Sequence, residues 1–176
     1  MNPRSASIET SRTILRRIAL SDLESLHRFE SNPLIMQFTP SRIPQTLEQT
    51  KTRLEGQIAK QASLEPFGIW MADLKATSTP VGWFMLMPAE NSQLELGFMI
   101  LQSHWNLGLT TEVSRALIEY VRKQTGIGKI IAKTNHDNFA SQRALEKLGF
   151  QRTGTTTVPE KVLGGEIVLQ NFELLM

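Results

Sequence analysis

The chain has 176 residues, a formal net charge of +2, 40% hydrophobic residues and no cysteine. A chain of this length fits one domain with a core that needs neither disulfides nor a metal ion. The missing cysteines exclude a disulfide framework, a thiol nucleophile and a cysteine-ligated metal. The near-neutral charge, without a dense Lys/Arg run, does not indicate a nucleic-acid partner.

The opening segment MNPRSASIETSR lacks the apolar core of a signal peptide. No apolar run in the chain approaches the ~20 residues that span a bilayer. A cysteine-free chain is also compatible with a reducing compartment. We therefore expect a cytoplasmic protein without membrane contact.

The first third of the chain is expected to hold one strand and two helices. Ile14 and Ile18 frame a short strand, and Ser21 or Asp22 can cap the helix that follows it. Prolines break Ser31–Gln45 into a loop with at most one helical turn. A polar helix follows over Gln45–Gln61.

The middle of the chain predicts three strands in a row. Phe67–Leu74 and Val81–Pro88 flank the turn signal KATSTP and should form an antiparallel pair. Leu94–Leu101 follows the polar turn AENSQ and has apolar side chains at every second position, which is the period of a half-buried strand.

Two helices and one strand come next. The first helix has an apolar stripe formed by Val113, Ala116, Leu117, Tyr120 and Val121. The strand covers Lys129–Thr134. Asp137 or Asn138 starts the second helix, and Gly149 stands where a left-handed glycine commonly ends one.

Two final strands begin at Phe150 and Glu166. The whole order predicts one α/β domain over residues 1–176, with a mixed, mostly antiparallel central sheet and helices on both of its faces. The strand Leu94–Leu101, the long helix and the strand Lys129–Thr134 should form a parallel crossover.

The junction SHWNLGLTTE joins the alternating strand to the long helix. A helix N-terminus leaves N–H groups unpaired and carries about half a positive charge, which favours an anion. Gly108 allows a ligand to approach the backbone, and Thr110 and Thr111 add hydroxyl donors. The same residues also fit an ordinary loop whose threonine caps the helix, and neither the P-loop nor the three-glycine dinucleotide pattern is present.

Two segments give this junction a wider context. His104-Trp105 precedes the loop Leu107–Glu112, and Asn138–Ser141 comes ahead of Lys147–Phe150. Together with the opening ILRRIALSDLESL, they resemble the GNAT (Gcn5-related) family of acyl-CoA N-acyltransferases. Within that family they resemble the RimJ/RimL-like branch that acetylates ribosomal-protein N-termini. The resemblance covers nearly the whole chain and implies a single GNAT-type domain.

The resemblance implies acetyl-CoA as the acyl donor. The main chain of Met99, Ile100 and Leu101 would hydrogen-bond the pantetheine arm, and Asn138 and Ser141 would lie beside the pantetheine and the thioester. The pyrophosphate would be held by the amides of Asn106, Leu107, Gly108, Leu109, Thr110 and Thr111. The loop departs from the family pattern where Asn106 replaces glycine and Thr110 replaces a smaller residue.

Acetyl transfer requires a neutral amine, and a protein α-amine, with a pKa near ~7.7–8.0, needs only a modest base. By resemblance, Ser141 would hydrogen-bond the leaving sulfur and Glu160 would be the base. Each has an alternative role: Ser141 fits a first-turn helix residue, and Glu160 fits a solvated loop carboxylate. Glu95 is the rival base, or an exposed strand residue.

Other charged residues carry weaker signals. His27, His104 and His136 have no metal-ligand spacing, so no metal is expected. Lys147 and Arg143 either reach the 3′-phosphate of the cofactor or are plain helix-surface charges.

The acceptor is expected to be a primary amine, in the first place the N-terminal α-amine of a peptide or protein. The alternatives are a small amine (an aminoglycoside, polyamine or amino-acid analogue) and a CoA-binding regulator without turnover. Pro33–Gln61 contains two glutamates against four Lys/Arg residues, which argues against polycationic acceptors. Both a monomer and a homodimer fit the sequence.

Overall fold

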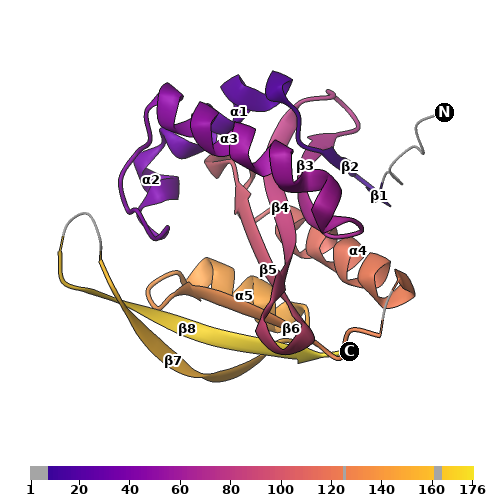
Figure 1. The fold of residues 1–176 in the computed structure, drawn as a ribbon, viewed down its shortest axis with the longest axis vertical. Helices are drawn as coiled ribbons and strands as arrows, with labels where there is room; N and C mark the ends of the chain where they lie inside the picture. The colour runs from indigo at the N-terminus through magenta and orange to yellow at the C-terminus, as the bar shows by residue number, and fades with distance from the viewer. Residues whose placement is uncertain (1–7, 125, 161–163) are drawn as a thin grey trace.

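The computed structural model describes residues 8–124, 126–160 and 164–176 and contains an eight-stranded sheet (Figure 1). The strands lie in the order β1-β2-β3-β4-β5-β6-β8-β7, and β5 and β6 are the parallel pair. The strands are β1 (Ile8–Glu9), β2 (Thr13–Arg17), β3 (Gly68–Leu74), β4 (Pro80–Ala89), β5 (Gln93–Ile100), β6 (Lys129–Asn135), β7 (Gln151–Pro159) and β8 (Glu166–Leu175). The α-helices are α1 (Leu23–Glu30), α2 (Pro33–Met36), α3 (Leu47–Gln61), α4 (Leu109–Gln124) and α5 (Phe139–Lys147).

One face of the sheet packs on α4 and α5. Leu117 of α4 and Leu145 of α5 share a buried cluster with Trp70 of β3 and Phe84 of β4. The predicted stripe of α4 lies in this cluster or against it. Because successive strand residues point to opposite faces, Met71 of β3 points the other way.

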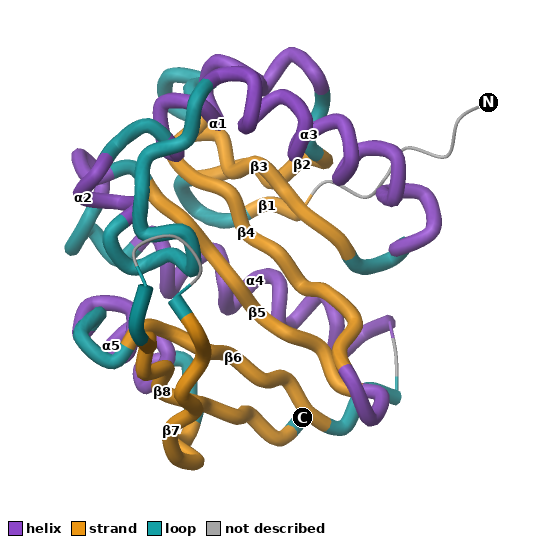
Figure 2. Tube along the Cα trace, turned by 60° about the vertical axis from the view of Figure 1, so that its left-hand side comes forward, coloured by secondary structure: helices purple, strands orange, loops and turns teal. Residues whose placement is uncertain are grey.

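The opposite face packs on α1 and α3. Leu26 and Phe29 of α1 and Leu54 of α3 are buried together with Ile69 and Met71 of β3. Figure 2 shows α1 and α3 on one side of the sheet and α4 on the other. Helices on both faces are therefore confirmed, as is the mixed, mostly antiparallel sheet.

The parallel crossover is confirmed too, as β5-α4-β6. Its two strands pair only near their starts, where Leu94 is opposite Ile130 and Glu95 is opposite Ile131. Beyond that point the two strands separate toward their carboxyl ends, where α4 and α5 begin (Figure 2). Within the sheet, the edge of β5 that faces β6 is thus left open over its second half.

Two local predictions need correction. The two-residue strand β1 was not predicted, which raises every later strand number by one. Asp22 precedes α1 as expected, but its side chain does not cap that helix. Its carboxylate accepts a hydrogen bond from the Ala19 N–H at 2.8 Å and pairs with Arg16, which also pairs with Asp73 of β3. Through Arg16, Asp22 ties the start of α1 to the sheet.

None of the helices in the described part of the chain combines the length and the apolar character needed to cross a membrane.

Candidate active site

Residues far apart in the sequence meet at one edge of the sheet, because the carboxyl ends of parallel strands point the same way. The loop before α4 follows β5 at this edge, and the N-terminus of α5 follows β6. β8 starts there, since Leu169 pairs with Asn135 at the end of β6. Glu160 follows β7 there, since Pro159 pairs with Glu166.

The loop between β5 and α4 bends through two left-handed residues, Asn106 (φ 61°) and Gly108 (φ 75°). Asparagine adopts this conformation more readily than most residues, which explains how Asn106 replaces the usual glycine. Leu109 is buried and anchors the start of α4. The Glu112 N–H donates to the Gly108 carbonyl at 3.0 Å, so the N–H groups between them are free of helical partners and can bind an anion.

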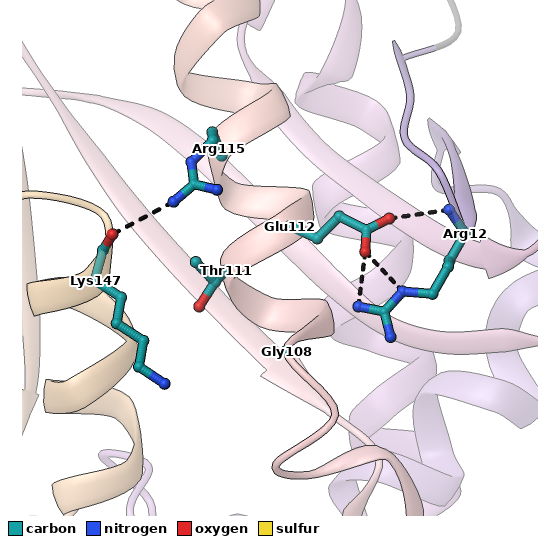
Figure 3. Close-up of a pocket in the computed structure, with 6 residues that line it drawn as sticks. All are labelled: Arg12, Gly108, Thr111, Glu112, Arg115 and Lys147. Carbon is teal, nitrogen blue, oxygen red and sulfur yellow. Dashed lines mark hydrogen bonds and ion pairs between the residues drawn. The ribbon is translucent and has the colours of Figure 1, made fainter.

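Arg12, next to β2, contacts both this loop and Glu112 of α4, and Figure 3 shows the contacts with Glu112. Its Nη1 donates to the Leu107 carbonyl at 2.9 Å, and its Nε donates to Glu112 at 2.7 Å. Glu112 also accepts from the Arg12 backbone N–H at 2.9 Å and from the Ser11 hydroxyl at 2.8 Å. We call these contacts the Arg12–Glu112 clamp. The Leu107 carbonyl, next to the start of α4, thus has a cationic hydrogen-bond donor.

The clamp also sets the charge of Glu112. Burial raises the pKa of this carboxyl, but hydrogen bonds from Thr10, Ser11 and Arg12 outweigh it and lower the pKa to about 2. Glu112 is therefore ionised at neutral pH. A carboxylate in the first turn of α4 would repel an anion there, and the adjacent Arg12 guanidinium offsets that repulsion.

A cavity of about 420 Å³ opens beside this loop. Its lining consists of Arg12, Gly108, Thr111, Glu112, Arg115 and Lys147. Gly108 and Thr111 were predicted as cofactor residues, and Lys147 was a candidate for the 3′-phosphate. Arg143 does not line this cavity.

Asn138 and Ser141 lie together at the N-terminus of α5. The Asn138 Oδ1 accepts the Ser141 N–H at 3.1 Å, so Asn138 is the residue that starts this helix. Gln142 donates to the His136 carbonyl at 2.6 Å and holds the preceding turn against the helix. The half-buried Ser141 thus has the expected first-turn position, and a role for its hydroxyl in chemistry stays a prediction.

Some of the backbone hydrogen-bonding groups at the end of β5 already have partners within the protein. The Leu101 N–H donates to the Val81 carbonyl at 2.8 Å, and the Trp105 indole N–H donates to the Ile100 carbonyl at 3.0 Å. Met99 pairs with Trp83 of β4. A pantetheine arm along β5 would therefore use the groups that face β6 and the second lone pair of the Ile100 carbonyl.

Glu160 is buried, so its interpretation as a solvated loop carboxylate is wrong. Its side chain is 2% exposed, and its Oε2 lies 3.9 Å from the Nε of Arg42. Arg42 comes from the loop between α2 and α3, where it has a left-handed φ of 56°. The Glu160 N–H donates to the Gly165 carbonyl at 3.0 Å. Burying a carboxyl group is costly unless a cation lies beside it, and Arg42 is the cation beside Glu160.

Arg42 also lines a second cavity, of about 210 Å³, at the same edge. The remaining lining residues are Asn135, His136, Asp137, Glu166, Ile167 and Val168. This cavity adjoins the N-terminus of α5, since His136 is bonded to Gln142. Polar groups of both signs therefore surround the space beside Glu160.

Glu95 lies elsewhere on the sheet. It is half-buried in the part of β5 that still pairs with β6, opposite Ile131. The six residue steps from Glu95 to Leu101 correspond to roughly 20 Å of extended chain. Glu95 is therefore a more distant base for a reaction at the open end of the pair than Glu160. No group of three or more His, Asp or Glu side chains among the described residues could hold a metal ion.

Sequence reasoning missed Arg12, Glu112 and Arg115 as parts of the site. Arg12 and Glu112 lie 100 positions apart, and neither belongs to a local pattern that predicts the other. Arg42 was noted only as a positive charge in the acceptor segment. Its contact with Glu160 depends on how the loop before α3 packs.

Comparisons with known proteins agree with this architecture. A family model described as an acetyltransferase (GNAT) domain matches residues 12–151. The Bacillus subtilis (strain 168) protein named "Uncharacterized N-acetyltransferase YoaA" is 28% identical over 149 residues, which is 84% of each chain.

Two solved structures have the same fold. The RimL ribosomal L7/L12 α-N-protein acetyltransferase in complex with coenzyme A has a TM-score of 0.82 at 17% identity, over 97% of this chain and 98% of that one. Spermidine N-acetyltransferase from Vibrio cholerae, in complex with CoA and spermine, has a TM-score of 0.78 at 16% identity, over 94% and 96%.

Proposed function

Because the chain belongs to the GNAT acetyltransferase family, we propose that it transfers the acetyl group of acetyl-CoA to the N-terminal α-amine of a peptide or protein. Membership makes it an acyltransferase with acetyl-CoA as donor, and the acceptor is the part that is proposed. The buried Glu160 at the open end of the β5–β6 pair is the observation that carries this proposal.

The donor is assigned to the side of α4. The left-handed turns at Asn106 and Gly108, the free N–H groups at the start of α4 and the cavity beside them fit the pyrophosphate of CoA. The pantetheine arm then runs between the separated ends of β5 and β6 toward Ser141. Together, these features support the predicted contacts with Asn106–Thr111 and Asn138.

The acceptor is assigned to the side of Glu160. The amine nitrogen attacks the thioester carbonyl carbon, the C–N bond forms, the C–S bond breaks, and the thiolate departs. Glu160 takes the proton that the amine loses, directly or through a water molecule. The Ser141 hydroxyl donates a hydrogen bond to the departing sulfur, which stabilises its negative charge.

An α-amine fits the immediate surroundings of Glu160. The Arg42 guanidinium lies beside Glu160, so an acceptor with a single positive charge avoids repulsion at that point, although Asp137 and Glu166 of the adjoining cavity would attract further positive charge. A peptide N-terminus has a neutral carbonyl next to its amine, which Arg42 can hydrogen-bond. The structural neighbours act on both kinds of acceptor, a ribosomal protein and spermidine.

A thiol-release assay with acetyl-CoA tests the proposal. Short peptides with free N-termini should release CoA, whereas the same peptides with blocked N-termini should not. Release only with polyamines or aminoglycosides would move the acceptor to the small-molecule class. CoA binding without release on any amine would indicate a regulator without turnover. The cytoplasmic location and the choice between monomer and homodimer stay predictions of the sequence.

A further inference from the structure

The cavity beside the start of α4 has more positive charge than a pyrophosphate loop needs. It is lined by three cationic side chains, from Arg12, Arg115 and Lys147, and by one carboxylate, from Glu112 (Figure 3). Backbone N–H groups and the helix dipole already serve a diphosphate at such a helix start. The additional cations therefore indicate a second anionic group.

One of these three cations, Arg12, is already paired within the Arg12–Glu112 clamp. Arg12 forms an ion pair of 2.7 Å with Glu112 and donates to the Leu107 carbonyl, so its charge is already paired. The charge of Glu112 is in turn balanced, and this carboxylate does not compete for the other two cations.

Arg115 and Lys147 are the remaining cations, and no described carboxylate pairs with either of them. Arg115 lies one helical turn after Thr111, on the same face of α4, and its Nη2 is 3.4 Å from the Lys147 carbonyl of α5. The two side chains therefore flank the cavity from two different helices (Figure 3). By contrast, Arg122, on the same helix, pairs with Glu119, and Arg152 pairs with Glu146.

The chemistry of the donor identifies the second anion. In CoA the pyrophosphate is attached to the 5′-oxygen of a ribose whose 3′-oxygen carries a separate phosphate. A pyrophosphate at Gly108 and Thr111 therefore leaves that 3′-phosphate within one ribose of the cavity lining. A guanidinium and an ammonium together suit a phosphate monoester, which presents three oxygens to donors.

We propose that Arg115 and Lys147 bind the 3′-phosphate of CoA and select 3′-phosphorylated donors over acyl groups carried on shorter pantetheine derivatives. This inference rests on the proposed function for the position of the CoA pyrophosphate at the start of α4. It extends that function from transfer chemistry to donor recognition, and it assigns Arg12 to the loop and not to the phosphate.

Binding measurements with two ligands test the proposal without any acceptor. Calorimetric titration of the full chain with CoA and with 3′-dephospho-CoA should give a dissociation constant roughly tenfold lower for CoA, as two charge-assisted contacts from exposed side chains allow. In the Arg115→Gln/Lys147→Gln double variant the two ligands should bind equally well, and affinity for 3′-dephospho-CoA should stay at the wild-type value.

Arg143→Gln is the matched control, because Arg143 is an exposed cation of α5 outside the cavity lining. It should keep the wild-type preference for CoA. An unchanged preference in the double variant overturns the proposal, as does an equal loss of affinity for both ligands, which would mean contacts with the pyrophosphate.

The outcome is separable from that of the proposed function. If neither ligand binds wild-type protein, the donor assignment fails and this inference fails with it. If CoA is preferred through Arg115 and Lys147 but no peptide is acetylated, the inference holds and the proposed acceptor fails.

Discussion

The two cavities at the open edge of the sheet differ in whether their charged side chains are paired with an opposite charge. Beside α4, two cations lie without a carboxylate partner among the described residues, and the only carboxylate of the lining is held by Arg12. Beside Glu160, the cation Arg42 lies against a buried carboxylate, and Asp137 and Glu166 line the same cavity. The cavity beside α4 therefore offers positive charge that no described carboxylate pairs with and that suits an anion, whereas the positive charge beside Glu160 already lies against a carboxylate.

This difference suggests how the two substrates are recognised. The donor cavity gains favourable charge interactions when a ligand arrives, so affinity should depend on phosphate groups and on salt. In the proposed acceptor cavity, Glu160 already lies beside a cation. An amine that approaches Glu160 must therefore replace part of its contact with Arg42, and the net gain in charge interaction is small. We expect tight donor binding and weaker acceptor binding that depends on shape. Four substitutions test this contrast.

The largest expected effect lies on the acceptor side. Glu160→Gln removes the proposed base and should lower kcat by about 10²-fold or more. Its pH–rate profile should move to higher pH, because the amine must then lose its proton unaided. Steady-state kinetics over a range of pH measure both, and a melting curve checks that the fold persists. Glu95→Gln is the matched control; if it, and not Glu160→Gln, removes activity, the base is Glu95.

Gly108→Val tests the donor loop. A left-handed φ of 75° costs a β-branched residue ~1–2 kcal/mol or more, so the loop should change shape and acetyl-CoA affinity should fall roughly tenfold. Gly56→Ala is the control, since Gly56 lies within α3 with nothing within 4 Å of the added methyl and no left-handed φ. Unchanged affinity in Gly108→Val would mean that the loop does not hold the cofactor.

Arg12→Ala should have a smaller effect of the same kind. It leaves the Glu112 carboxylate and the Leu107 carbonyl without their Arg12 contacts beside the proposed phosphate site, so CoA affinity should fall about fivefold. Arg12→Ala/Glu112→Ala should recover part of that loss, because the repulsive charge is gone. If the double variant binds as weakly as the single one, the clamp acts through loop shape alone. Titration calorimetry measures both variants.

The smallest expected effect is on stability as a function of pH. The folded pKa of Glu112, about 2, lies below its ordinary value of 4.5, so its contribution to the free energy of unfolding is fully present above pH 4.5. That contribution should be lost progressively as the pH falls toward 2. Urea unfolding of wild type and Glu112→Gln should show a difference that narrows over this interval. A constant difference would contradict the assigned pKa.

Periodicity predicted most of the fold. The alternation in Leu94–Leu101 and the stripe of α4 are local patterns, because a strand or helix that buries one face repeats apolar residues at a fixed spacing. The left-handed Gly149 after α5 was predicted for the same kind of reason, and its φ is 93°. β1 was missed because two residues carry no period, and Asp22 was assigned to a cap because its partner Arg16 is set by tertiary structure.

The site was predicted less completely than the fold. The loop around Gly108 and the start of α5 were found through short motifs, and the structure brings them to one edge of the sheet. The burial of Glu160 was not predictable, because Arg42 reaches it from a segment more than a hundred residues earlier. The partners of Glu112 lie equally far away.

The Arg12–Glu112 clamp has a consequence for assembly of the molecule. It joins residue 12 to residue 112, a contact of high sequence separation, and such contacts form late because a long loop of chain must close first. The turn to which we assign the cofactor pyrophosphate is therefore completed only when the N-terminal hairpin returns to α4. A fusion or truncation that displaces Ser11 and Arg12 should impair cofactor binding even though every residue of the SHWNLGLTTE turn is intact.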